Sequence, residues 1–143
     1  MYTVQKAIEV SCAHRLEGHV KCSRLHGHNY LIVATVKGTT LDEAGMLIDF
    51  GDLKTLLREV HDEIDHKYIV SQENIRSICP YYDAAVADAR EDEIVVLSIP
   101  TSTAENIAKW VLSYLDRRLP AFVKVSHVEV HETMSSVAQA WRE

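Results

Sequence analysis

Two histidines separated by one residue, His26 and His28, are the first feature of the sequence that could support chemistry. They come just before a strand-like stretch, and in extended backbone residues i and i+2 point to the same side. His14 lies near the end of an earlier strand-like stretch, so a hairpin would bring it alongside them. Three neutral imidazoles with an open fourth position form the ligand set of a catalytic zinc site. The alternative is a chance pair on a solvated strand edge, because no Cys-x-x-Cys or His-Glu-x-x-His pattern accompanies it.

A cysteine, Cys22, precedes His26 by four residues and lies between Lys21 and Arg24. Nearby cations and a nearby metal both favour the thiolate form of a cysteine. The spacing leaves three roles open: a fourth metal ligand, a catalytic base or nucleophile, or an inert loop cysteine.

An adjacent carboxylate and imidazole, Asp65 and His66, follow a predicted helix. A carboxylate that accepts a proton from an imidazole fixes its tautomer and raises its basicity, as in acid–base sites. Adjacent residues seldom pair directly, so each is expected to contact a third group. The alternative is that the two residues simply end the helix, where His66 would favour the negative C-terminus.

Another carboxylate, Glu132, ends a strand-like run in which alternation places it on the same face as Val128 and Val130. A carboxylate on an apolar face is costly unless it is paired, which indicates a partner or a ligand. Its two oxygens suit a guanidine-like edge, such as the 2-amino and N3 positions of a pterin or a guanine. The alternative is a residue at the strand end that is already exposed to water.

Two helices and four strands are expected to position these side chains. Helical spacing of apolar residues predicts one helix from Asp49, its N-cap, to Ile64, and a capping-box pattern at Ser102 to Glu105 begins a second that ends before Pro120. Alternation predicts strands at residues 3–12, 29–36, 122–132 and 136–141. This order indicates an α+β domain with its helices on one face of an antiparallel sheet. Residues 70–99 are expected to form an exposed loop excursion, in which 94–97 could add a short strand.

The composition is that of one soluble domain spanning residues 1–143. Its 143 residues are 47% hydrophobic and 25% charged, and the formal net charge of −6 argues against nucleic-acid and anionic-membrane partners. No apolar run approaches the roughly 18 residues of a membrane span, and the N-terminus lacks the apolar core of a signal peptide. Three cysteines exclude a fully paired disulfide framework within the chain, so a cytoplasmic location is expected.

Six short motifs, taken in sequence order, resemble the 6-pyruvoyltetrahydropterin synthase / 6-carboxytetrahydropterin synthase family. The match runs from about Tyr2 to Trp141. The motifs are Ser11-Cys-Ala-His14-Arg-Leu, Cys22-Ser-Arg-Leu-His26-Gly-His28-Asn-Tyr, Gly45-Met-Leu-Ile-Asp-Phe-Gly-Asp52-Leu-Lys, Asp65-His66-Lys, Thr103-Ala-Glu-Asn106 and Val130-His-Glu132-Thr133.

The resemblance implies the T-fold, a four-stranded antiparallel sheet with two helices on one face, oligomerising into a barrel. It further implies a homohexamer, a dimer of trimers, whose active sites lie between subunits. By the same likeness, the bound metal would be Zn2+, held by His14, His26 and His28. The catalytic set would be Cys22, Asp65 and His66, and Glu132 would anchor the pterin.

The implied substrate is 7,8-dihydroneopterin triphosphate, from which triphosphate is eliminated. The product is 6-carboxy-5,6,7,8-tetrahydropterin, with loss of acetaldehyde, in one branch of the family and a pyruvoyl pterin in the other. Three residues between Cys22 and His26 resemble the bacterial and archaeal carboxy enzymes, which serve 7-deazaguanine (queuosine-type) biosynthesis. The length of the 70–99 excursion departs from compact bacterial members, and this leaves the pyruvoyl product as the alternative.

Two other classes of function remain open. One is a non-catalytic T-fold module that binds zinc and a pterin or purine, although such a module would not need Cys22 beside Asp65 and His66. The other is a zinc-storage protein, which would use the remaining histidines as well. These match no motif and are expected to be surface or structural residues: His19, His61, His127 and His131. Cys12 is expected to be a small buried hydrophobe and Cys79 to be incidental.

Overall fold

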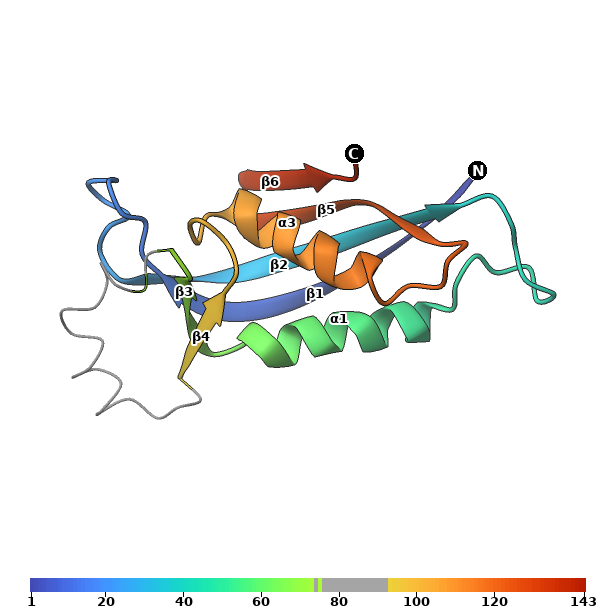
Figure 1. Ribbon diagram of the computed structural model, residues 1–143, viewed down its shortest axis with the longest axis horizontal. Coiled ribbons are helices and arrows are strands. Elements are labelled where there is room, and N and C mark those ends of the chain that lie inside the picture. Colours follow the sequence, from blue (N-terminus) through green and yellow to red (C-terminus); the bar gives the residue numbers. More distant parts are fainter. Residues whose placement is uncertain (74, 76–92) are drawn as a thin grey trace.

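Two long strands joined as a hairpin form the centre of the computed structural model, which describes residues 1–73, 75 and 93–143 (Figure 1). Strand β1 (Tyr2–His14) pairs antiparallel with β2 (His26–Gly38) along its whole length. The register runs from Tyr2 opposite Gly38 to His14 opposite His26. The predicted hairpin is therefore confirmed, and it places the first histidine beside the His-x-His pair.

Two further antiparallel strands extend the sheet on the β2 side. Strand β5 (Lys124–Thr133) pairs with β2, and β6 (Ser136–Trp141) pairs with β5. Val128 and Val130 of β5 are fully buried, which confirms the alternation predicted for this strand.

The sheet has six strands in the described part of the chain, so the prediction of a four-stranded antiparallel sheet is wrong in number and in direction. The strand order is β4-β3-β1-β2-β5-β6. Strand β3 (Lys67–Ser71) pairs parallel with β1 through Cys12 and Ala13, and β4 (Ile94–Leu97) pairs parallel with β3. The helix that precedes β3 runs in the same direction as β1, and β3 continues directly from its end, so it lies parallel to β1 (Figure 1).

The predicted loop excursion at residues 70–99 overlaps a strand at its beginning, because β3 extends to Ser71. Near its end, β4 confirms the short strand expected at residues 94–97. These runs of five and four residues are too short for periodicity to separate a buried strand from a loop. Cys79 lies outside the described residues.

Both predicted helices are present and capped. Helix α1 (Phe50–Ile64) begins after Asp49, whose side chain accepts a hydrogen bond from the Gly51 N–H, as predicted. Helix α3 (Ala104–Asp116) begins after Thr103, one residue later than the predicted capping box. The Ser102 hydroxyl instead donates to the carbonyl of Arg15, which ties the start of α3 to the end of β1.

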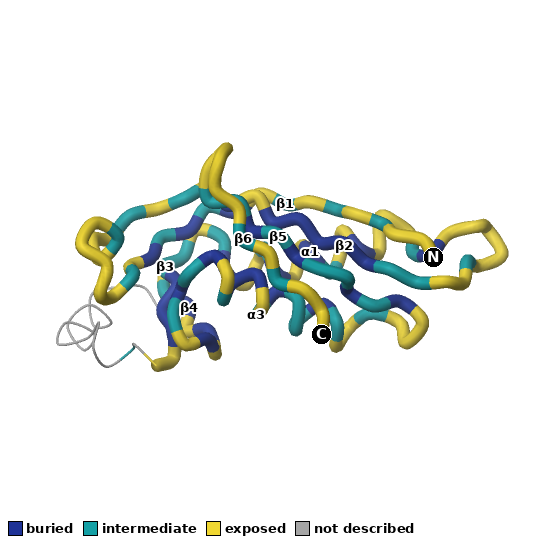
Figure 2. Tube along the Cα trace, turned by 90° about the horizontal axis from the view of Figure 1, so that it is seen from above, coloured by how far each residue is buried: buried dark blue, intermediate teal, exposed yellow. Residues whose placement is uncertain are grey.

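Both helices cover the same face of the sheet, and the core lies between them and that face. Figure 2 shows the buried segments running along the strands and helices, with exposed loops around them. No helix in the described ranges is long and apolar enough to cross a bilayer. The core combines alternate residues of the strands with one side of each helix: Val10, Tyr30, Ile32, Val128, Val130, Leu53, Leu57, Val60, Ile107 and Val111.

Candidate metal centre and acid–base residues

The three predicted metal ligands converge at one end of the central hairpin. His14 lies opposite His26, and His28 lies opposite Cys12, so all three rings project from the helix-covered face. Ring centroids are 4.6 Å apart for His14 and His26 and 5.0 Å apart for the two other pairs. One nitrogen of each ring lies within 4.8 Å of the others, which is a spacing that could hold a metal ion.

The nitrogen atoms of these rings are arranged as a metal site requires. His14 Nδ1 lies 2.7 Å from the carbonyl oxygen of Ser102, and His26 Nδ1 lies 2.6 Å from that of Arg24. A carbonyl only accepts, so each Nδ1 carries the proton and each Nε2 keeps its lone pair. His28 Nε2 is buried without a hydrogen-bond partner among the described residues. A buried polar atom of this kind is costly unless something binds it, so a metal ion fits this set.

Burial lowers the pKa of His14, the most enclosed of the three, which is 0% exposed. The hydrogen bond to Ser102 raises this pKa, the neighbouring His26 and His28 lower it, and the Glu132 charge raises it. The net decrease favours the neutral imidazole, which is the form that binds metals.

Glu132 lies close enough to the histidines to interact with them electrostatically. Its charge raises the pKa of His14. The pKa of Tyr30 is raised mainly by burial and next by the charge of Glu132. Glu132 is half-buried and lines a pocket of about 270 Å³ together with Leu16, Thr103 and Ser136. A carboxylate and the histidine cluster therefore lie near one another at the same end of the sheet.

Asp65 and His66 pair directly, contrary to the expectation for adjacent residues. His66 Nδ1 lies 2.6 Å from Asp65 Oδ2, and the Ser11 N–H donates to Asp65 Oδ1 at 2.9 Å. Asp65 caps α1 in an extended conformation, whereas His66 has a φ of 57°, in the left-handed region. This change of backbone region between neighbours brings the ring back to the carboxylate, and the His66 N–H donates to the Ser11 carbonyl at 2.7 Å.

The environment of Asp65 keeps its carboxyl group ionised. Burial by itself would raise the pKa of Asp65, but the Ser11 N–H and the His66 hydrogen bond outweigh it, with help from the charges of His61 and His66, and the pKa is lowered. A stable carboxylate on Nδ1 leaves His66 Nε2 for proton exchange, and the His66 side chain is 81% exposed.

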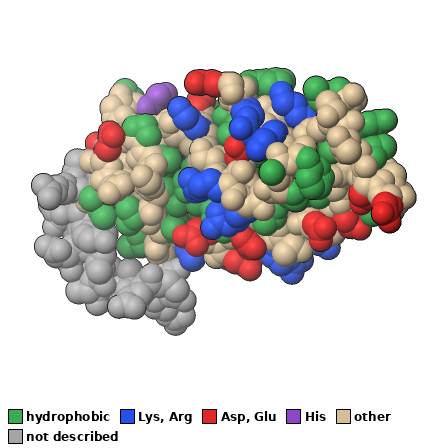
Figure 3. Space-filling model, turned by 45° about the vertical axis from the view of Figure 1, so that its right-hand side comes forward, with side chains coloured by type: hydrophobic (Ala, Val, Ile, Leu, Met, Phe, Trp, Pro, Cys, Tyr) green, Lys and Arg blue, Asp and Glu red, His purple; other side chains and the backbone are tan. Residues whose placement is uncertain are grey.

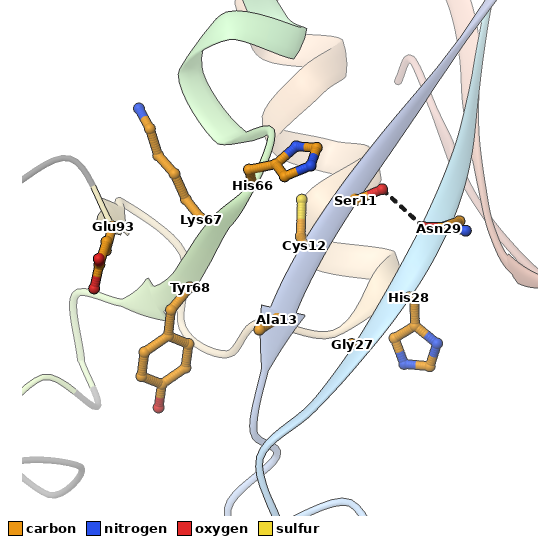
Figure 4. A pocket seen from close by; sticks show the side chains of 10 residues that line it. All are labelled: Ser11, Cys12, Ala13, Gly27, His28, Asn29, His66, Lys67, Tyr68 and Glu93. Carbon is orange, nitrogen blue, oxygen red and sulfur yellow. Dashed lines mark hydrogen bonds between the residues drawn. The ribbon is translucent and has the colours of Figure 1, made fainter.

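His66 lines the same pocket as His28, but not a pocket lined by Glu132. A pocket of about 630 Å³ is lined by Ser11, Cys12, Ala13, Gly27, His28, Asn29, His66, Lys67, Tyr68 and Glu93. Figure 4 shows the His66 ring beside Cys12 and Ser11, whereas the His28 ring points away from it on the far side of β2. Among the described residues, no hydrogen bond or ion pair joins His66 to the three histidines.

Cys22 lies in the loop between β1 and β2 and is partly exposed. Its backbone N–H donates to His19 Nδ1 at 3.1 Å, and its carbonyl accepts from the Leu16 N–H at 2.7 Å. No hydrogen bond within the described ranges joins its thiol to the histidine cluster. The three histidines therefore cluster with Glu132 near His14, and no hydrogen bond in the described ranges links Cys22 or His66 to them, although His66 and His28 line one pocket.

Cys12 is a buried hydrophobe, as predicted. Its side chain is 6% exposed and donates to the Ile64 carbonyl at 3.1 Å. Burial, helped by the Asp65 charge, raises the pKa of the Cys12 thiol to about 12, so this thiol stays protonated.

The residues that sequence reasoning missed act through their backbone. Ser11 holds Asp65 and His66 with its N–H and carbonyl, and Ser102 holds His14 with its carbonyl. A backbone contact leaves no signature in the type of side chain. The glycine between the two histidines of the His-x-His pair is a sequence feature that reflects this packing. A Cβ at Gly27 would lie 3.1 Å from the Cys12 carbonyl oxygen, so a larger residue would crowd β1.

The sequence of this chain is similar to those of a known protein family. Residues 3–143 match the family described as 6-pyruvoyl tetrahydropterin synthase. A Pyrococcus horikoshii protein named putative 6-carboxy-5,6,7,8-tetrahydropterin synthase is 31% identical over 128 residues, which cover 87% of this chain and 78% of that protein. The Aquifex aeolicus 6-carboxy-5,6,7,8-tetrahydropterin synthase is 34% identical over 127 residues, which cover 83% of this chain and 75% of that protein.

Solved structures share the fold over the whole chain. An uncharacterized protein of Wolinella succinogenes superimposes with a TM-score of 0.83 at 24% identity, covering 99% of this chain and 98% of that one. The Plasmodium vivax 6-pyruvoyltetrahydropterin synthase superimposes with a TM-score of 0.71 at 22% identity, covering 99% of both chains. These likenesses establish the common fold.

Proposed function

The chain belongs to the 6-pyruvoyl tetrahydropterin synthase family, and on that premise we propose that it is a zinc-dependent lyase acting on 7,8-dihydroneopterin triphosphate. The proposed products are 6-carboxy-5,6,7,8-tetrahydropterin, triphosphate and acetaldehyde, for 7-deazaguanine biosynthesis. The observation that carries the proposal is the convergence of three histidines beside Glu132. The names of the relatives and the spacing of Cys22 from His26 support the carboxy product.

The metal site would be formed by His14, His26 and His28. Among the described residues, the hydrogen-bond contact to an Nε2 atom of these rings is a long one of 3.4 Å between His14 Nε2 and the Tyr30 hydroxyl. When bound there, zinc would act as a Lewis acid on the hydroxyl and carbonyl oxygens of the substrate side chain. Three protein ligands leave an open position for such an oxygen, as in other catalytic zinc sites.

Glu132 would bind the pterin ring. Its carboxylate is acceptor-only and can take two N–H bonds from the guanidine-like edge of the ring. It is the penultimate residue of β5, it lines a pocket, and its charge acts on His14, so a ring bound there would present its side chain toward the histidines.

Cys22 and the Asp65–His66 pair would move the protons. Cys22 as the thiolate would take a proton from a side-chain carbon of the substrate. His66, held by Asp65 through Nδ1, would exchange a proton through Nε2 on the opposite face of the substrate.

The triphosphate would be bound by local positive charge in a protein whose net charge is −6. Arg15, Lys21 and Arg24 are exposed in the loop that joins the two strands carrying the histidines. Lys and Arg side chains also gather among acidic ones on the face drawn in Figure 3, so the charge is uneven over the surface.

The active site would be completed by a second subunit in a homohexamer built as a dimer of trimers. Two observations support this assembly. No hydrogen bond in the described part of the chain joins the Cys22 thiol or His66 to the histidine cluster, so a neighbour could supply one of these groups. In addition, β6 ends the sheet in the described part of the chain and leaves a strand edge for a partner. A cytoplasmic location is part of the proposal and agrees with the free thiols of Cys12 and Cys22.

The test is incubation of the zinc-loaded protein with 7,8-dihydroneopterin triphosphate under anaerobic conditions, with products identified by mass spectrometry. Acetaldehyde and a 6-carboxypterin are the expected products. A pyruvoyl product would replace the carboxy reaction by the alternative. Binding of zinc and pterin without turnover would support the non-catalytic module. The matched control is Cys22→Ala, which should lose turnover and keep one zinc per chain, whereas loss of zinc would make Cys22 a ligand.

A further inference from the structure

A second imidazole lies on the carboxylate that holds His66. His61 Nε2 is 3.4 Å from Asp65 Oδ2, the same oxygen that lies 2.6 Å from His66 Nδ1. The other oxygen, Oδ1, accepts from the Ser11 N–H at 2.9 Å. One carboxylate oxygen is therefore shared between two histidines, while the other is occupied by the backbone.

Main-chain hydrogen bonds hold this arrangement in place. His61 and Asp65 are four residues apart at the end of α1, and the Asp65 N–H donates to the His61 carbonyl at 2.8 Å. The His66 N–H donates to the Ser11 carbonyl at 2.7 Å, which maintains the left-handed backbone of His66. The three side chains thus project from a helix end that is bonded to β1.

The two imidazoles face different surroundings. His66 lines the pocket of about 630 Å³ described above, and His61 lines another of about 340 Å³ on the side of α1 and β1. The charged groups around His61 are Asp62, whose Oδ1 is 3.0 Å from His61 Nδ1, Glu9 of β1, and Lys54 and Arg58 of α1. The His61 side chain is 37% exposed, so solvent protons reach it independently of the pocket that His66 lines.

On the basis of the proposed function, we propose that His61 is a positioning residue that shares Asp65 with His66 and couples the protonation of the two rings. A proton on His61 draws the charge of Asp65 toward α1 and weakens its hold on a proton at His66. When His61 is neutral, the Asp65 carboxylate stabilises a proton on His66 more strongly.

The competing explanation is that His61 only stabilises α1. A cation in the last turn of a helix interacts favourably with the C-terminal carbonyl groups, whatever it does to Asp65. Under that explanation, replacing His61 would change the stability of the protein and leave the protonation of His66 unchanged.

The experiment is an NMR titration of the His66 ring in the zinc-loaded protein and in two variants. His61→Gln removes the charge, and His61→Lys makes it permanent. The midpoint of the His66 titration should rise by roughly 0.5 in pH in His61→Gln and fall by a similar amount in His61→Lys. The matched control is His127→Gln, which removes another histidine paired to a carboxylate and should leave His66 unchanged.

An unchanged His66 midpoint in His61→Gln, or shifts in the same direction in both variants, would overturn the proposal. The titration does not depend on turnover, so its result stands apart from the proposed function. Shifts of opposite sign in a protein without turnover would support the coupling and reject the enzyme. In an active protein, the pH profile of kcat should move with the His66 midpoint, at unchanged zinc content.

Discussion

The Nδ1 atom of His14 lies 2.7 Å from the carbonyl oxygen of Ser102, a residue 88 positions later in the chain. The contact sets which nitrogen of the ring is free before any metal arrives. His26 is held in the same way by the Arg24 carbonyl, two residues away. Ring orientation fixed by backbone carbonyls reduces the cost of binding, because the ligands need little rearrangement.

We predict that the protein binds one zinc per chain and that binding raises its Tm. At a free zinc concentration about 100 times Kd, binding contributes about 2.7 kcal/mol, or a rise of roughly 5–10 °C for a chain of this length. His28→Ala should lose both the zinc and the rise, because it removes the unpartnered Nε2. Metal analysis and thermal unfolding with and without zinc measure the two effects.

The matched control for the zinc prediction is His131→Ala. His131 pairs with Glu129, and strand alternation places both on the sheet face that the helices do not cover. Its zinc content should remain one per chain. More than one zinc in the unaltered protein, reduced by this substitution, would favour the storage alternative.

We predict that iodoacetamide at neutral pH modifies Cys22 and not Cys12 in the folded protein. Cys22 is partly exposed, whereas Cys12 is buried with a pKa raised to about 12. The thiolate is the reactive form, so Cys12 should react only after unfolding. Peptide mapping by mass spectrometry reads each cysteine separately, and early labelling of Cys12 would contradict its protonated, buried state.

We predict that Asp65→Asn lowers the free energy of unfolding by about 1.5–3 kcal/mol at pH 7, the usual range for hydrogen bonds to charged groups. The pKa of Asp65 is lowered from its ordinary value of 3.8 by folding. The unfolded chain therefore takes up the proton first as the pH falls, and the contribution of the carboxylate is lost below pH 3.8. Urea unfolding measures the free energy of unfolding of both proteins at pH 7 and at pH 3. The difference between Asp65→Asn and the unaltered protein should be smaller at pH 3. A constant difference would mean that the charge does not stabilise the fold.

We predict that Glu132→Gln weakens the binding of a pterin by roughly 10-fold or more, because a neutral amide loses the charge-assisted bonds to the ring edge. Fluorescence titration with 6-carboxypterin measures this loss. Glu129→Gln serves as the control, since that carboxylate is already paired with His127 and His131. Equal affinity in Glu132→Gln and the unaltered protein would remove its anchoring role.

The local features of this protein could be read from the sequence alone. The N-cap residue Asp49 and the spacing of the apolar residues predict α1. Both are readable because the side-chain contacts along a helix join residues three or four positions apart. The central hairpin and the convergence of His14 with His26 and His28 follow from strand alternation and antiparallel pairing of neighbouring strands. These interactions are encoded in side chains that are close in the sequence.

Tertiary structure alone decided the position of β3 and the partners of Asp65 and His14. The parallel pairing of β3 with β1 depends on the direction of α1, which the periodicity of a five-residue run does not contain. Ser11 and Ser102 act through backbone atoms that every residue possesses, so their identity gives no signal. Contacts between backbone segments that are distant in the sequence depend on how whole helices and strands pack against one another. The types of the contacting residues do not encode them.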